Sequence, residues 1–347
     1  MFYVLQSPDQ QAGRLQNWNP LQTVTISSNN PHEHNTLLSM KRIPTIIFGL
    51  FLLSSCTPVP STEIPATQLP ILAIRETAVV TTVPVPTATS IPCDPTTTDF
   101  CLVDWTFTFQ NPLGSNSPLT IARSYPYGST ENGQRDPHRG VDIESRDGAP
   151  VYAPAAGLVI FAGRDHKRIY TPWDDYYGNL IVIQHDGGLY TLYGHLSQIN
   201  VAVGDQVNGG DVIAAVGNTG VAIGSHLHFE IRTGGDGSDF FSTENPELWL
   251  PLQSGMGAIS ITLDGNNEEK ILRNLVIIRY APGTTTSEKK YYVSTYPKEF
   301  EHSQEDFAIN SLPPGRYRIA FTDATGLYER IVNVEAGKLT QVVIQLK

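Results

Sequence analysis

Histidine and aspartate side chains at two places in the sequence are spaced so that they could hold a metal ion. His138 and Asp142 are four residues apart and can share one face of a strand or, roughly, of a helix. His226 and His228 alternate with apolar residues in the run 226–231, which is typical of a strand with one buried face. Their two imidazoles would then project together into one cleft. Each pair is a weak signal by itself, because similar spacings are common among surface residues.

Taken together, these residues provide the ligands of a catalytic zinc site. His138, Asp142 and one histidine of the second pair make three ligands, and catalytic zinc sites leave the fourth position open for water. One histidine of that pair is then left over. His195, which directly follows the predicted strand 189–193, is another. Two spare imidazoles are what a zinc hydrolase needs for general acid–base chemistry.

The region from about residue 120 to residue 235 resembles the lysostaphin-type, LytM-like zinc endopeptidases, which cut the peptides of peptidoglycan. The match is dense and keeps the family's order of motifs. The segments that carry it are 124–128, 138–143, 150–157, 177–179, 191–196, 203–207, 217–220 and 224–230.

This resemblance implies a zinc-dependent endopeptidase that hydrolyses peptide bonds in bacterial peptidoglycan with a zinc-activated water. His138, Asp142 and His228 would bind Zn²⁺. His195 and His226 would flank the water as catalytic residues, and their two roles cannot be told apart. Two alternatives are a catalytically silent regulator of another cell-wall hydrolase and a surface adhesive or scaffolding protein. Retention of all five positions favours the enzyme.

Other residues of this region have mainly structural interpretations. His185 ends a predicted strand, and Tyr193 is expected to pack rather than to line the groove. His166 lies in a polar insert, residues 164–175, that is longer than the family minimum. The aromatic residues in and just after this insert could shape the substrate groove or merely fold the loop.

Strands and turns must position these residues, because no long helical periodicity appears in the sequence. We predict an all-β, antiparallel fold with two parts. An endopeptidase domain with a metal-containing groove would span residues 93–252, and a small β-sandwich would span residues 258–347. The segments 312–317 and 334–337 resemble carboxypeptidase regulatory-like, transthyretin-like modules. Such a module could bind the wall, bind a protein partner or act as a spacer.

The N-terminal part predicts export and lipid anchoring. In residues 40–56, a basic start and an apolar run end in Leu-Ser-Ser-Cys, which looks like a bacterial lipobox that would lipidate Cys56. A short buried helix with a chance cysteine is the alternative. Residues 1–39 are interpreted as an upstream extension or a disordered segment. Residues 57–92, with 7 Pro and 8 Thr, form a linker. The protein would be extracytoplasmic and attached to a membrane of the cell envelope.

Composition supports this interpretation. The chain has 347 residues, 40% of them hydrophobic, which is enough for a sizeable core. A formal net charge of −11 with no basic block makes nucleic acid an unsuitable partner. In an oxidising compartment, Cys93 and Cys101 are expected to form a disulfide across a small loop.

Overall fold

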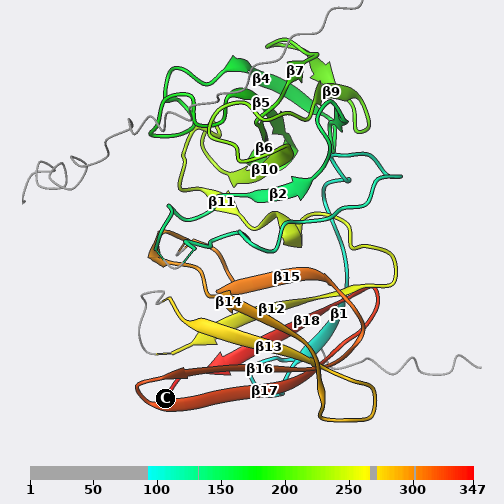
Figure 1. Cartoon of the computed structure of the whole chain (residues 1–347), viewed down its shortest axis with the longest axis vertical. Helices are drawn as coiled ribbons and strands as arrows, with labels where there is room; N and C mark the ends of the chain where they lie inside the picture. The colour runs from blue at the N-terminus through cyan, green and yellow to red at the C-terminus, as the bar shows by residue number, and fades with distance from the viewer. Residues whose placement is uncertain (1–92, 132, 266–271, 301) are drawn as a thin grey trace, which may run out of the picture. The chain divides into compact units, whose positions relative to one another are not determined.

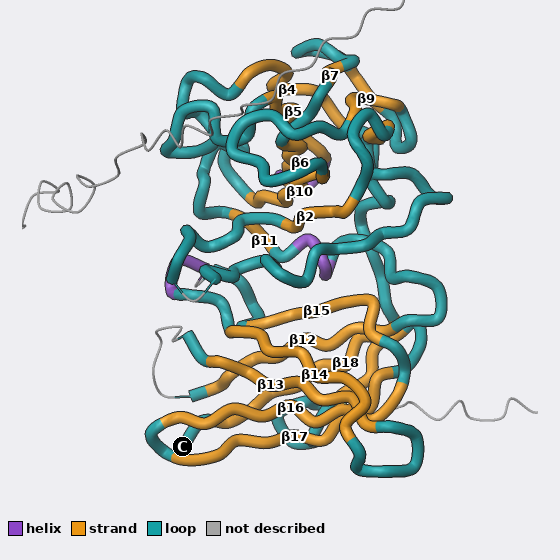
Figure 2. Tube along the Cα trace, in the orientation of Figure 1, coloured by secondary structure: helices purple, strands orange, loops and turns teal. Residues whose placement is uncertain are grey.

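The computed structural model describes residues 93–347 except residues 132, 266–271 and 301 (Figure 1). The predicted upstream extension, signal segment with Cys56 and linker lie outside the described residues. Within them, strands make up nearly all of the regular structure and helical residues occur only in short 3₁₀ turns (Figure 2), which confirms the all-β prediction. No helix in this described part is long and apolar enough to cross a membrane.

Four of the five predicted site residues belong to a seven-stranded antiparallel sheet. Three of them lie in its strands, and the fourth directly follows one of its strands. Its strand order is β11-β10-β6-β5-β4-β8, and β2 pairs with the free part of β10. The strands are β2 (Val141–Glu144), β4 (Gly157–Arg164), β5 (Asn179–His185), β6 (Leu189–Gly194), β8 (Gln206–Val207), β10 (His226–Thr233) and β11 (Thr243–Glu244). A three-stranded sheet is formed by β3 (Pro150–Tyr152), β9 (Val212–Ala215) and β7 (Gln198–Ile199).

Side chains cover both faces of the central strands of the large sheet. The four residues 180–183 of β5 are all fully buried, the pattern of a strand with protein on either side. Ile181 and Ile183 belong to the main core, whereas Leu180 and Val182 pack with Tyr170 and other aromatic residues in and after the predicted insert. The insert therefore contributes to the core beneath one face of the sheet.

Two four-stranded sheets form the C-terminal part. One has the order β1-β18-β12-β15 and the other the order β14-β13-β16-β17. The strands are β1 (Cys101–Asp104), β12 (Gly257–Asp264), β13 (Asn274–Tyr280), β14 (Ser287–Ser294), β15 (Phe307–Leu312), β16 (Gly315–Asp323), β17 (Gly326–Val334) and β18 (Lys338–Gln345). All pairings are antiparallel except β12 with β18, because the chain leaves β12 for the other sheet and returns in the same direction. Their buried side chains share one core with those of the large sheet.

Strand β1 departs from the predicted segmentation. It lies within residues 93–252, the predicted endopeptidase domain, yet it pairs with β18 at the edge of a C-terminal sheet. The expected disulfide between Cys93 and Cys101 is present and closes the loop that leads into β1. The pairing brings together segments more than 200 residues apart, which no local sequence pattern signals.

Candidate metal centre and groove

Asp142 and His228 face each other across two neighbouring strands. They are paired in the antiparallel register of β2 and β10. Along β10, Leu227 and Phe229 enter the main core, so His226 and His228 share the other face of the strand. The strict alternation of the sequence thus produces the predicted pair of imidazoles on one side.

His138 reaches the same place from the loop before β2. The approach is tight at Gly140, where a Cβ atom would lie 2.4 Å from the carbonyl oxygen of Phe229. Only glycine lets the chain pass so close to β10 between the two predicted ligands. This explains why a glycine stands between His138 and Asp142.

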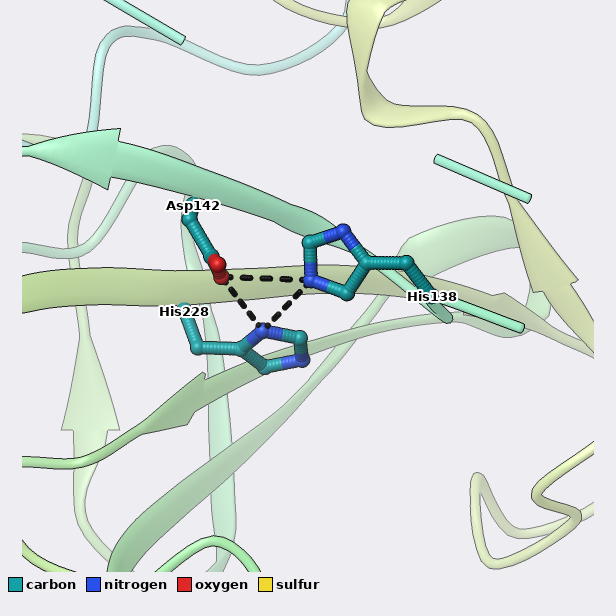
Figure 3. A group of neighbouring side chains, drawn as sticks. All are labelled: His138, Asp142 and His228. Carbon is teal, nitrogen blue, oxygen red and sulfur yellow. Dashed lines mark hydrogen bonds and ion pairs between the residues drawn. The ribbon is translucent and has the colours of Figure 1, made fainter. Parts of the chain in front are cut away.

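The three predicted ligand atoms converge (Figure 3). His138 Nε2 lies 3.2 Å from Asp142 Oδ1 and 3.2 Å from His228 Nδ1. The remaining side of the triangle, from His228 Nδ1 to Asp142 Oδ1, is 2.9 Å. Ligands at zinc–nitrogen and zinc–oxygen bond lengths would be about 3.3 Å apart in a tetrahedron. Two imidazoles and one carboxylate at these separations fit zinc in ligand type and in spacing.

Hydrogen bonds on the far side of each imidazole direct the other nitrogen into the site. His138 Nδ1 lies 2.7 Å from the carbonyl oxygen of Tyr125, so Nδ1 carries the proton and Nε2 keeps its lone pair. His228 Nε2 donates to Glu230 Oε1 at 3.0 Å, which leaves Nδ1 facing the centre. Partners of this kind fix the tautomer and orientation of metal ligands.

Glu230 is held in turn by a buried network. Its Oε2 accepts from Arg232 at 2.8 Å, and its Oε1 accepts from the Tyr177 hydroxyl at 2.5 Å. Burial would raise the pKa of Glu230, but the charge of Arg232 and the bond from His228 lower it to about 2. The carboxylate is therefore ionised behind the ligand. Sequence reasoning missed this role, although Glu230 and Arg232 continue the alternation that starts at His226.

The electrostatics of the centre favour a cation. Burial alone would lower the pKa of His228, but its hydrogen bonds to Asp142 and Glu230 raise it to about 9. Burial would raise the pKa of Asp142, yet the neighbouring His138 and His228 hold it far below its ordinary value. The two carboxylates thus stabilise positive charge at the point where the three ligand atoms meet.

His195 and His226 lie beside this centre, as predicted. Their ring centres are 5.0 Å apart, and His226 Nε2 is 3.5 Å from Asp142 Oδ1. His195 Nδ1 donates to the carbonyl oxygen of Thr219 at 2.8 Å, and His226 Nδ1 donates to that of Gly224 at 2.9 Å. Each imidazole therefore keeps its Nε2 lone pair.

Both of these histidines are neutral at pH 7. Burial and the neighbouring His228 lower the pKa of His195 to about 3, and burial also lowers the pKa of His226. His195 has a φ of +63°, an uncommon backbone conformation for a residue other than glycine. This turn at the end of β6 places the imidazole in the groove.

A groove of about 600 Å³ surrounds the centre. All five predicted site residues line it, together with Tyr125, Tyr176 and the loop 221–225. Val221 and Ile223 on that loop are exposed apolar side chains.

The remaining predictions for this region are resolved by burial. Tyr193 is fully buried and packs on Phe229, as expected. His185 is buried and bonds to Thr191 and to a backbone carbonyl, which confirms its structural role. Of the aromatic residues in and after the insert, Tyr176 lines the groove, while Tyr170, Trp173 and Tyr177 pack beneath it. His166 is exposed.

Residues 136–240 match the model of Peptidase family M23. This segment includes all five predicted site residues and the groove loop 221–225. The chain therefore contains a Peptidase family M23 domain, and the predicted resemblance to this class of peptidases is confirmed.

Three curated relatives each match about a third of the chain or less. The DD-carboxypeptidase/endopeptidase Mpg of Neisseria meningitidis serogroup B is 43% identical over 98 residues, which are 28% of this chain and 20% of Mpg. The peptidoglycan DD-endopeptidase ShyA of Vibrio cholerae is 41% identical over 95 residues, 27% of this chain and 20% of ShyA. The uncharacterized lipoprotein YgeR of Escherichia coli is 36% identical over 115 residues, 33% of this chain and 41% of YgeR. The chain thus spans about a fifth of the first two relatives.

Proposed function

We propose that the protein is a zinc-dependent endopeptidase that hydrolyses peptide bonds in bacterial peptidoglycan. The observation that carries the proposal is the convergence of His138, Asp142 and His228 beside two further histidines, His195 and His226, in one groove. The M23 domain and the relatives named as DD-endopeptidases support the same reaction. His195 and His226 are the proposed catalytic residues.

The chemistry follows from the side chains of the groove. A zinc ion held by the three ligands would supply a Lewis acid and a water molecule of lowered pKa. His195 and His226 each offer an Nε2 that can accept the proton of the attacking water. The water oxygen forms a bond to the peptide carbon, the C–N bond breaks, and the proton passes from Nε2 to the leaving amine. The Thr219 and Gly224 carbonyls keep both rings oriented throughout.

The test measures zinc and cleavage in the same samples. The full chain is purified in detergent and compared with His228→Ala, which removes one ligand. We expect about one zinc per chain in the wild type and new peptide termini in fragments released from purified peptidoglycan, measured by mass spectrometry. Both should be lost in His228→Ala.

A matched variant separates the site from general effects. His166→Ala removes an exposed imidazole outside the groove and should keep both zinc and cleavage. Zinc without cleavage would favour the silent regulator of another hydrolase. A wild type with neither zinc nor cleavage would refute the enzyme.

We also propose that the protein is anchored outside the cytoplasm through a lipid on Cys56. The lipobox-like residues before this cysteine support the anchor, and the relative YgeR is named a lipoprotein. Mass spectrometry of the processed N-terminus is the test. A chain that begins at a diacylated Cys56 would support the anchor, and Cys56→Ala should then release the protein from membranes. An unprocessed or unlipidated N-terminus would refute it.

A further inference from the structure

His138 differs from the other two proposed ligands in how it is held. Asp142 and His228 lie in paired strands, whereas His138 lies in the loop before β2. The position of His138 depends on Tyr125, whose ring stacks on the imidazole at 4.2 Å and whose carbonyl oxygen accepts from Nδ1. The loop 123–139 therefore determines where this ligand sits.

Two aromatic residues of the C-terminal part lie directly against that loop. Tyr127 is buried with its ring edge-on to Tyr296 at 5.0 Å and to Phe300 at 4.9 Å. At Gly128, a Cβ atom would lie 2.7 Å from the Tyr296 ring. The Gly128 amide donates to the carbonyl oxygen of His138 at 2.8 Å. Tyr296 is thus in contact with the backbone that bonds to His138.

Arg139, the residue after His138, also contacts Phe300. The guanidinium of Arg139 is buried, with its carbon 4.4 Å from the centre of the Phe300 ring. Two of its nitrogens, Nε and Nη1, have no hydrogen-bond partner among the described residues. The aromatic faces around it are therefore its main contacts. Phe300 thus contacts the residue that follows His138, together with Phe240 and Phe241, whose ring centres lie 4.9 and 4.8 Å from the same carbon.

Charged contacts hold the start of the loop. Arg123 bonds to Glu247 Oε1 at 2.6 Å and to the carbonyl oxygen of Asn310 at 2.9 Å. The Asn310 amide donates to Glu247 Oε2 at 2.8 Å. Asn310 lies in β15, so the loop is attached to the C-terminal part at both of its ends.

We propose that Tyr296 and Phe300 are positioning residues for the metal site, and that they act by fixing the loop 123–139 and so His138. The C-terminal part is then a support of the metal centre itself, in addition to any binding role. This inference rests on the metal site of the proposed function but not on its substrate.

The experiment measures metal binding directly. Zn²⁺ affinity of the full chain is measured by competition with a chelating dye, and the absorption spectrum of the Co²⁺ form reports ligand geometry. Phe300→Ala removes the ring that supports both Tyr127 and Arg139. We expect Zn²⁺ to bind on the order of tenfold more weakly, with an altered Co²⁺ spectrum.

Two further variants separate positioning from loss of stability. Phe321→Ala removes a buried ring that stacks on Tyr328 in the same part of the chain, and no described contact joins it to the loop. It should lower the melting temperature but leave Zn²⁺ affinity within twofold of wild type. Phe300→Leu keeps most of the apolar volume but lacks the aromatic ring that contacts Arg139 and Tyr127, so its affinity and spectrum should lie between those of wild type and Phe300→Ala.

The outcomes are distinct. Equal Zn²⁺ affinity in wild type and Phe300→Ala would overturn the inference and leave the proposed function standing. Equal weakening by Phe321→Ala would also overturn it, because the effect would then be general destabilisation. If Phe300→Ala does not fold, Phe300→Leu decides: an unchanged affinity and spectrum overturn the inference, and an intermediate shift in both supports it. A wild type that binds no metal would refute the inference and the proposed function together.

Discussion

The buried pair Glu230–Arg232 allows a specific prediction of stability. Both side chains have zero exposure and lie 2.8 Å apart. In Arg232→Met the Glu230 carboxylate loses its counter-charge and stays buried behind His228. Removing one partner of such a pair costs about 3–5 kcal/mol of unfolding free energy.

The pKa of Glu230 leads to a similar figure. Its ordinary value is 4.5, and the folded protein holds it at about 2. This difference is the net effect of burial and of the contacts to Arg232, His228 and Tyr177, and at 1.36 kcal/mol per pKa unit it corresponds to about 3 kcal/mol at neutral pH. We therefore expect Arg232→Met to lower the melting temperature by about 6–10 °C in a unit of this size.

Urea unfolding of the metal-free protein is the assay. The free energy of unfolding is compared at pH 7 and pH 3.5 for wild type, Arg232→Met and the double variant Glu230→Gln/Arg232→Met. Stability that comes from a depressed carboxyl pKa is lost as the pH falls from 4.5 towards 2. The deficit of Arg232→Met should therefore shrink at pH 3.5. The double variant, without a buried charge, should be about 2 kcal/mol more stable than Arg232→Met at pH 7.

Three results would refute this reasoning. One is a deficit below about 1 kcal/mol for Arg232→Met at pH 7, which would mean that water reaches the carboxylate. Another is a double variant no more stable than Arg232→Met. A third is a deficit that does not depend on pH. An unchanged urea slope in each variant is the control for two-state unfolding.

Three further predictions concern single sites. His195→Ala should keep one zinc per chain but lower kcat by about 10²–10⁴, and a lost zinc would assign His195 to binding instead. Burial lowers the pKa of His185, so the unfolded chain binds a proton below about pH 6.5 that the folded chain does not. Stability should fall as the pH drops below about 6.5, and His185→Gln, measured by urea midpoints, should show a shallower fall. Reducing the Cys93–Cys101 disulfide should cost roughly 2–3 kcal/mol by the loop-closure estimate. An unchanged urea midpoint in dithiothreitol would contradict that estimate.

The site was predictable because its signal is local. The alternation in residues 226–231 defines a strand with one core face, and the structure shows that face in Leu227 and Phe229. Two histidines two residues apart must then lie on the other face, whatever the rest of the chain does. The spacing of His138 and Asp142 was a weaker signal by itself. Their assignment as metal ligands depended on the resemblance to a known family.

The supports of the site were not predictable in the same way. Tyr296 and Phe300 are brought to the loop before His138 by contacts between distant segments, and no periodic pattern marks them. Glu230 and Arg232 are an intermediate case. They continue the alternation of β10 on the face that begins with the predicted histidines. Two charged residues at these positions could have been assigned to a buried hydrogen-bond network behind the metal ligands.

The pairing of β1 with β18 bears on when the molecule can fold during synthesis. Asp104 and Lys338 meet although they are 234 positions apart, and β18 also lies between β1 and β12. Contacts of such long sequence separation form slowly, and a ribosome delivers the early segments first. A nascent chain that already contains all five site residues would still lack β18 and a completed sheet. Because the segment 295–300 lies against the loop that carries His138, we expect the proposed metal site to be completed only after these late residues have emerged.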